Sequence, residues 1–173
     1  MSIHSLLLFA RRLQLRLFSQ LYVKDNELLL KLIWDPDDIN EEGGVKPSAF
    51  RKDELVNRSK GVSVDRYALC RVRVLNAIIA KQKRKAGAPG IVREKAFLSR
   101  LRCLQVREIA IDGKRQFVVD ATPTEQTDDV PTNPAHAEIF NDSGIQSRSH
   151  ILKIRLEIAH LCSNPVEVDE VLR

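Results

Sequence analysis

The sequence predicts an α+β domain with a mostly antiparallel sheet, two long helices and a peripheral N-terminal helix. Three observations favour this fold class. Short apolar runs separated by polar turns are typical of strands, and two of them flank Asp112-Gly113, a strong hairpin signal. Apolar residues recur at helical spacing after Asp65 and over 147–161. Strands and helices also mix without the regular alternation that a doubly wound parallel sheet requires.

The size and composition fit one globular domain. The chain has 173 residues, of which 43% are hydrophobic and 29% charged. These values exclude a collagen, a coiled-coil rod and a wholly disordered chain. Because the longest apolar run near the start, 6–10, is far shorter than the roughly 20 residues of a membrane helix, we expect no membrane span. We divide the chain into an N-terminal helix or extension, 1–23, and a single domain, 24–173.

The N-terminal segment is basic and amphipathic. Apolar residues recur at helical spacing between Leu6 and Phe18, and the segment contains Arg11, Arg12 and Arg16 but no acid. Four interpretations stay open: a helix packed on the domain or on a partner, an extension without a structural role, a targeting segment, or a helix on a membrane surface.

In the first half of the domain, the sequence predicts two strands joined by a loop. An apolar run over 27–34 predicts a strand, which Asp35-Pro36 ends. The polar stretch 40–60 predicts a long loop that Ala49-Phe50 holds against the core. A short strand is expected at 61–64.

A helix and a hairpin follow. Asp65 is the predicted N-cap of the helix, and glycine and proline after residue 85 end it. Over 97–111 two alternating stretches are out of phase by one residue, which predicts a strand with a bulge. Asp112-Gly113 then joins this strand to the next one at 116–119.

In the last part of the domain, the sequence predicts a loop, a strand and the clearest helix. The acidic, Pro/Thr-rich stretch 122–134 predicts a solvated loop, and 135–140 a short strand. The helix over 147–161 is capped by Ser147 or Ser149 and ends before Pro165.

Charge is distributed unevenly. The net charge is +5, yet 66–107 contains twelve Lys and Arg residues and one acid. The flanking stretches are acidic: 25–54 has nine acids and four bases, and 120–142 has six acids and no Lys or Arg. A basic zone attracts phosphates unless acids of the same chain neutralise it. The candidate binding residues are Arg71, Arg73, Lys81, Lys83, Arg84, Lys85, Arg100 and Arg102.

No cofactor or metal is predicted. The three cysteines, Cys70, Cys103 and Cys162, are widely spaced, which argues against a disulfide framework or a zinc knuckle and favours buried thiols in a reducing compartment. The four histidines show no metal-ligand spacing, and the chain lacks a phosphate-binding glycine loop and a nucleophile elbow.

Three side chains are the candidates for catalysis: His136, Ser63 and Arg66. A strand would place His136 beside Glu138 on one face, an arrangement suited to acid/base chemistry. In the alternative interpretation, His136 bonds loop backbone and orders the entry to its strand. Ser63 and Arg66 also have two interpretations. In the first, they form a polar pocket with His136 for a phosphate-bearing ligand. In the second, Arg66 only forms a salt bridge.

Three segments carry a resemblance: Lys46-Pro47-Ser48-Ala49-Phe50, Gly61 to Arg66, and Asn133-Pro134-Ala135-His136-Ala137. In this order they resemble a group of small bacterial proteins with Ser-Ala-Phe, Ser-Val-Asp and Asn-Pro-Ala-His segments. The resemblance spans about residues 28–162 and implies no activity. It implies a bacterial cytoplasmic protein and a shared site of Ser48, Ser63, Asp65, Asn133 and His136.

Three functions follow as hypotheses. The first is a binding protein whose basic surface meets nucleic acid or an acidic partner. The second is a small enzyme or phosphate-ligand-binding domain that uses Ser63, Arg66 and His136. The third is a subunit that docks through its N-terminal helix. Whether the protein is an enzyme stays open.

Overall fold

The computed structural model describes residues 22–56, 60–84, 93–144 and 147–171. Six strands form one sheet in the order β6-β7-β2-β1-β3-β8, in which every pair is antiparallel. The prediction of an α+β domain with a mostly antiparallel sheet is therefore confirmed. The sheet strands are β1 (Leu28–Pro36), β2 (Val62–Arg66), β3 (Arg93–Arg102), β6 (Phe117–Ala121), β7 (His136–Asn141) and β8 (Val166–Glu167).

The helical elements lie on both sides of the sheet. They are η1 (Pro47–Ala49), α2 (Lys52–Val56), η2 (Tyr67–Leu69), α3 (Val72–Arg84), α4 (Cys103–Glu108), α5 (Arg148–His160) and α6 (Val168–Val171). The two long helices that the sequence predicts are thus α3 and α5. The predicted N-terminal helix falls outside the described residues except at Tyr22 and Val23, which are not helical.

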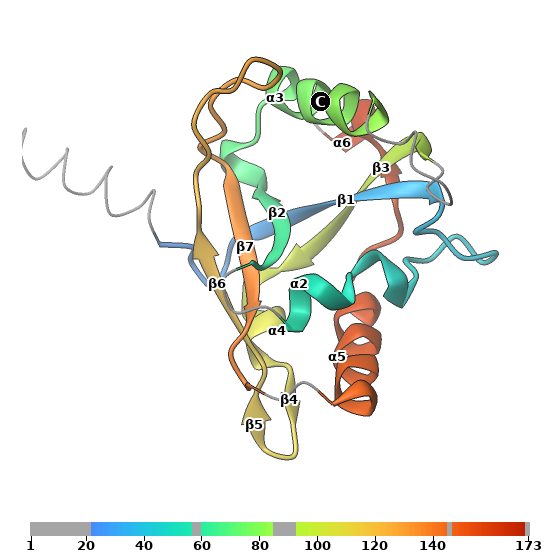
Figure 1. The fold of residues 1–173 in the computed structure, drawn as a ribbon, viewed down its shortest axis with the longest axis vertical. Helices are drawn as coiled ribbons and strands as arrows, with labels where there is room; N and C mark the ends of the chain where they lie inside the picture. Colours follow the sequence, from blue (N-terminus) through green and yellow to red (C-terminus); the bar gives the residue numbers. More distant parts are fainter. Residues whose placement is uncertain (1–21, 57–59, 85–92, 145–146, 172–173) are drawn as a thin grey trace, which may run out of the picture.

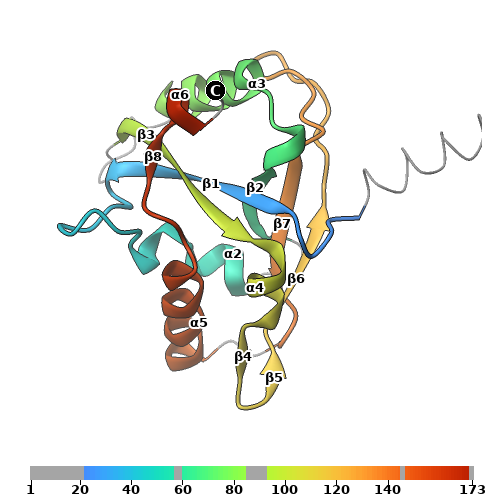
Figure 2. The same ribbon diagram turned by 180° about the vertical axis from the view of Figure 1, so that it is seen from behind.

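Each face of the sheet has its own core. On the α5 face, Leu29 and Ile33 of β1 pack with Phe50 and with apolar residues of α5. On the α3 face, Leu30 and Leu98 pack with residues of α3 and α6. Figure 1 shows α3 and α6 above the sheet, with α2, α4 and α5 below it, and Figure 2 shows the same layers from behind. Alternation along β1 assigns neighbouring residues to opposite cores.

The beginning of α3 differs from the prediction. Asp65 is not a helix cap: it lies in β2, which continues to Arg66, and η2 then separates the strand from α3. The helix begins at Val72, and the carbonyl of Arg71 accepts bonds from the amides of Val74 and Leu75. The predicted cap is wrong because Asp65 and Arg66 find distant polar partners that keep them in the sheet.

The predicted bulge is also wrong, whereas the hairpin is confirmed. The chain forms α4 where the alternation changes phase, so Cys103 and Val106 both point inward at helical spacing. A two-stranded hairpin follows, made of β4 (Ala110–Ile111) and β5 (Lys114–Arg115). Its turn residues Asp112 and Gly113 have φ angles of 52° and 73°, as a type I′ turn requires.

The remaining elements follow the prediction in part, and β8 and α6 lie after Pro165, where the sequence predicts no element. Ala49 and Phe50 are buried, but the predicted loop over 40–60 also contains η1 and the short helix α2. The amide of His150 donates to the Ser147 side chain, so Ser147 caps α5.

Candidate functional site

A row of polar side chains lies on the α3 face of the sheet. The register pairs Asp65 with His136 and Ser63 with Glu138, and residues directly opposite each other in an antiparallel pair point to the same face. The intervening residues Val64 and Ala137 are buried on the α5 face. The expectation that His136 and Glu138 share a strand face agrees with this register. We call Ser63, Asp65, His136 and Glu138 the polar row.

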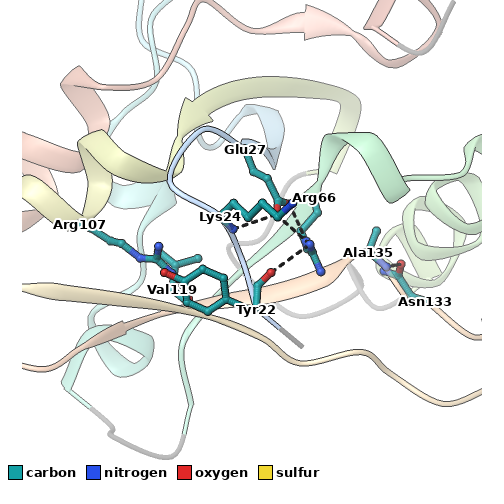
Figure 3. Close-up of polar contacts among 8 residues, drawn as sticks. All are labelled: Tyr22, Lys24, Glu27, Arg66, Arg107, Val119, Asn133 and Ala135. Atoms are coloured by element: carbon teal, nitrogen blue, oxygen red, sulfur yellow. Dashed lines mark hydrogen bonds and ion pairs between the residues drawn. The ribbon is translucent and has the colours of Figure 1, made fainter. Parts of the chain in front are cut away.

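The structure does not bring Arg66 to this row. Arg66 is paired with Leu29, so its side chain lies on the opposite face, where it is only 4% exposed. Its Nε and Nη2 atoms donate to the two oxygens of Glu27 at 2.7 and 2.8 Å, and Nη2 also donates to the carbonyl of Tyr22 (Figure 3). The predicted pocket of Ser63, Arg66 and His136 is therefore not formed, and Arg66 has the salt-bridge role of the alternative interpretation.

His136 is bonded to the loop that precedes β7. Its Nδ1 lies 2.7 Å from the carbonyl oxygen of Thr122 and 2.9 Å from the Thr122 hydroxyl. Because a carbonyl oxygen only accepts, Nδ1 carries the proton, which leaves the lone pair of the neutral ring on Nε2. These contacts match the interpretation in which His136 orders the entry to its strand. The ring retains one basic nitrogen.

Asn133 connects the loop to Asp65. Its side-chain NH2 group donates to Asp65 Oδ1 at 2.7 Å. Its side-chain carbonyl accepts a hydrogen bond from the backbone amide of Ala135 (Figure 3). Burial raises the pKa of Asp65 above its ordinary value, although the bond from Asn133 and the neighbouring His136 act in the opposite direction. Asn133 thereby supplies a hydrogen bond to a half-buried carboxyl group.

The residues of the resemblance divide into two groups. Ser63, Asp65, Asn133 and His136 lie together on one side of the sheet. Ser48 is exposed in η1, which packs against α5 on the other side. The structure thus brings four of the five together and leaves Ser48 apart.

Comparison of the chain with family models, with curated proteins and with solved structures finds no match. Its function is therefore inferred from the contacts and charges of its own residues.

The thiols contribute no reactive group. Burial raises the pKa of Cys70 to about 12, and the neighbouring Asp65 adds to the shift. Burial also raises the pKa values of Cys103 and Cys162 to about 11. All three are protonated at neutral pH and are poor nucleophiles. Within the described ranges, no cluster of three or more His, Cys, Asp or Glu side chains is placed to hold a metal, and no helix is long and apolar enough to cross a membrane.

A second buried cation lies between β1 and β2. The two strands pair at only two positions, and Lys31 Nζ donates to the carbonyl of Ser63 at 3.4 Å where they diverge. Burial lowers the pKa of Lys31 from its ordinary value of 10.5, while the nearby carboxylate of Glu54 acts against this shift. Nζ also lies 5.8 Å from the centre of the Phe50 ring. No local sequence pattern pointed to this group, because its surroundings come from distant segments.

Acids of the same chain neutralise part of the basic stretch. The ion pairs are Arg66–Glu27, Arg84–Asp129, Lys95–Glu167 and Arg107–Asp25. Glu27 and Asp25 come from the first acidic stretch and Asp129 from the second. Six of the predicted binding residues have no acidic partner among the described residues. They are Arg71, Arg73, Lys81, Lys83, Arg100 and Arg102. Lys85 lies outside the described residues.

Four of the unpaired cations, Arg71, Arg73, Lys81 and Lys83, lie on α3 or just before it, and Arg100 and Arg102 lie on β3. This helix contains no acid, and its buried side, with Val74 and Leu75, turns Arg73 and Lys83 outward. Arg100 and Arg102 are exposed on β3, on the sheet face that α3 partly covers. We add Arg84, whose ion pair with Asp129 is exposed, and call the whole group the basic surface: Arg71, Arg73, Lys81, Lys83, Arg84, Arg100 and Arg102.

Tyr67 links the two parts of the basic surface. The Arg100 guanidinium lies 5.8 Å from the centre of the Tyr67 ring, and Tyr67 belongs to η2, which leads directly into α3. Tyr67 is 38% exposed. Arg100 thereby contacts the 3-10 turn that precedes the helix.

Proposed function

We propose that the protein binds the phosphate backbone of double-stranded nucleic acid through the basic surface. One observation carries this proposal: six cations, four on or just before a helix without acids and two on β3, have no acidic partner in the part of the chain that the structure describes. The acidic stretches neutralise other arginines and leave these available. Lysine and arginine side chains that contact phosphates supply most of the affinity in non-specific nucleic-acid binding.

The shape of the helix supports a regular polyanion as the ligand. Thirteen residues make α3 about 20 Å long. Arg73 and Lys83 are separated on its exposed side by Asn76 and Ala80, which are small enough to let a backbone approach closely. Phosphates along a duplex repeat at a constant spacing and so can meet cations along the whole helix.

A duplex is favoured over a single strand because free aromatic surfaces are scarce in the part of the chain that the structure describes. Binding of single strands uses aromatic rings on which bases stack. Trp34 is 4% exposed and donates to Gln82. Tyr22 and Tyr67 are exposed, but the guanidinium of Arg107 or Arg100 lies over each ring.

The polar row supports an enzyme less well. Thr122 and Asn133 hold His136 and Asp65 in place, and the arginine expected to bind a phosphate faces the other way. Docking through residues 1–23 stays a prediction, because nearly all of that segment lies outside the described residues.

The test is to measure binding to three fluorescent polyanions by anisotropy at 50 mM salt: a 20-base-pair duplex, a 20-nucleotide single strand and polyglutamate. We expect the duplex to bind with a Kd of about 1 µM and the other two at least about tenfold more weakly. Equal or tighter binding of polyglutamate would assign the surface to an acidic protein. Absence of duplex binding would refute the proposal.

A further inference from the structure

A cleft of about 240 Å³ lies between α2 and α5, away from the basic surface. Both ribbon views show α2 beside α5 on the side of the sheet opposite α3 (Figures 1 and 2). Ile151, which is buried, and Leu152, which is exposed, give the cleft an apolar lining. Sites for drug-sized ligands are usually larger, so this cleft fits a single large apolar side chain.

Three cations surround the apolar lining: Lys52, Arg148 and Arg155. Arg155 donates through Nε to the carbonyl of Pro47 at 2.8 Å, which leaves the terminal nitrogens of its guanidinium for other acceptors. Lys52 and Arg148 have no acidic partner among the described residues. Glu157, the acid of α5, follows Arg148 by nine positions and so lies on the opposite side of the helix.

The apolar surface continues along α5. Leu152 is 53% exposed and Leu156 is 39% exposed. The two are one turn apart and lie on the same side of the helix. Adjacent exposed leucines beside a cleft are typical of a docking surface, because burying them in a complex removes apolar area from water.

We propose that this cleft binds an acidic amphipathic segment of a partner protein. One apolar side chain of the partner fills the cleft, a second packs on Leu156, and carboxylates on the neighbouring turns bond to Lys52 and Arg148. The charge of the cleft argues against the chain's own residues 1–21 as the occupant, because that segment has three arginines and no acid. The site is independent of the duplex-binding proposal, since it uses neither α3 nor β3.

The probe is a labelled 16-residue peptide with leucines on one helical face and glutamates elsewhere, and binding is measured by anisotropy on the full chain. Two control peptides replace every glutamate with lysine or every leucine with alanine. We expect saturable binding of the first peptide only. Arg148→Glu and Leu152→Ser should each weaken it by about tenfold or more, as loss of a central contact does. Lys153→Glu is the matched control, since Lys153 is exposed on another side of α5 and should leave binding unchanged.

Several outcomes would overturn the proposal. Equal binding of either control peptide, or an equal loss with Lys153→Glu, would show unspecific attraction. A dimer in sedimentation that Arg148→Glu dissociates would assign the cleft to a second copy of the chain. Loss of duplex binding with Arg148→Glu would assign it to nucleic acid. The three substituted residues are exposed, and thermal unfolding of each variant verifies that the fold is retained.

Discussion

Two regions of the molecule use arginine in opposite ways. Near the start of β1, Arg66 and Arg107 bond to Glu27 and Asp25 and hold residues 22–27 against the sheet. Around α3, Arg71 and Arg73 are exposed and lack acidic partners among the described residues. All four arginines come from one basic stretch. The difference shows that a net positive segment divides into structural and available charges only after folding.

The degree of burial explains why Arg66 is expected to stabilise the fold and why Arg71 and Arg73 are expected to bind a ligand. Arg66 is 4% exposed and Glu27 is 15% exposed, so each would be left as an uncompensated charge without the other. Burial alone would raise the pKa of Glu27, but the hydrogen bonds from Arg66 and from the Lys24 amide outweigh it, and its pKa is lowered. Charges in water, by contrast, contribute little to folding and remain free to bind phosphate.

The largest effect is expected from Arg66→Ala. It leaves Glu27 buried without its partner and should lower the free energy of unfolding by about 3 kcal/mol, measured by urea denaturation at pH 7. Adding Glu27→Gln should restore part of this loss, because the unpaired charge is then absent. Duplex binding should not change under conditions in which the variant is folded. A loss of stability below about 1 kcal/mol would contradict the structural role of this pair.

Asn133→Ala should have the next largest effect. It removes the hydrogen bonds to Asp65 and to the amide of Ala135, at a cost of about 2 kcal/mol in the free energy of unfolding. Thr132→Ala, a change at the exposed neighbouring residue, serves as the control and should be nearly neutral. If the two variants are equally stable in urea, Asn133 does not hold the polar row together.

Lys31→Met should stabilise the protein at pH 7, by about 1 kcal/mol, because Lys31 forms no ion pair among the described residues and the substitution replaces its buried ammonium group with an apolar chain. Because folding lowers the pKa of Lys31, the unfolded chain binds more protons than the folded protein between that lowered pKa and 10.5, and wild-type stability rises with pH over this window. The advantage of the variant should shrink as the pH rises from 7 toward 10. Urea unfolding across this range measures it, and a variant that is clearly less stable at pH 7 would show that the bond to Ser63 outweighs burial.

The smallest effect is expected from Asp129→Asn. The pair that Asp129 forms with Arg84 is exposed, with about half of each side chain in water, so stability should change by less than about 0.5 kcal/mol. Release of Arg84 should increase the affinity for the duplex by about threefold. An unchanged affinity would place Arg84 outside the basic surface.

The sequence predicted the parts of the fold that depend on local patterns. The hairpin at Asp112-Gly113, the strand carrying His136 and the helix capped by Ser147 are all present. The strand predicted at 61–64 ends too early, because Asp65 and Arg66 are two polar residues after an apolar run and such residues are typical of a turn. Their hydrogen-bond partners, Asn133 for Asp65 and Glu27 for Arg66, are distant in sequence.

The candidate site was predicted only in part for the same reason. Strand alternation correctly places His136 and Glu138 on one face. Had β2 been extended to Arg66, the same alternation would have separated Arg66 from Ser63. The cleft beside α5 depends on the position of α2 inside a segment that the sequence presents as a loop, so no local pattern pointed to it.

The salt dependence of duplex binding tests the central claim most directly. The wild-type protein, Arg71→Ala/Arg73→Ala and the control Lys114→Ala/Arg115→Ala are titrated between 50 and 200 mM salt. The control removes two exposed cations of the β4–β5 hairpin, at the opposite end of the molecule from α3 (Figure 1). Six phosphate contacts predict a slope of about −5 in log K against log salt for the wild type. We predict that the α3 variant loses about two units of slope and the hairpin variant none. An equal change in both variants would contradict the account, because binding would then follow net charge rather than the surface around α3.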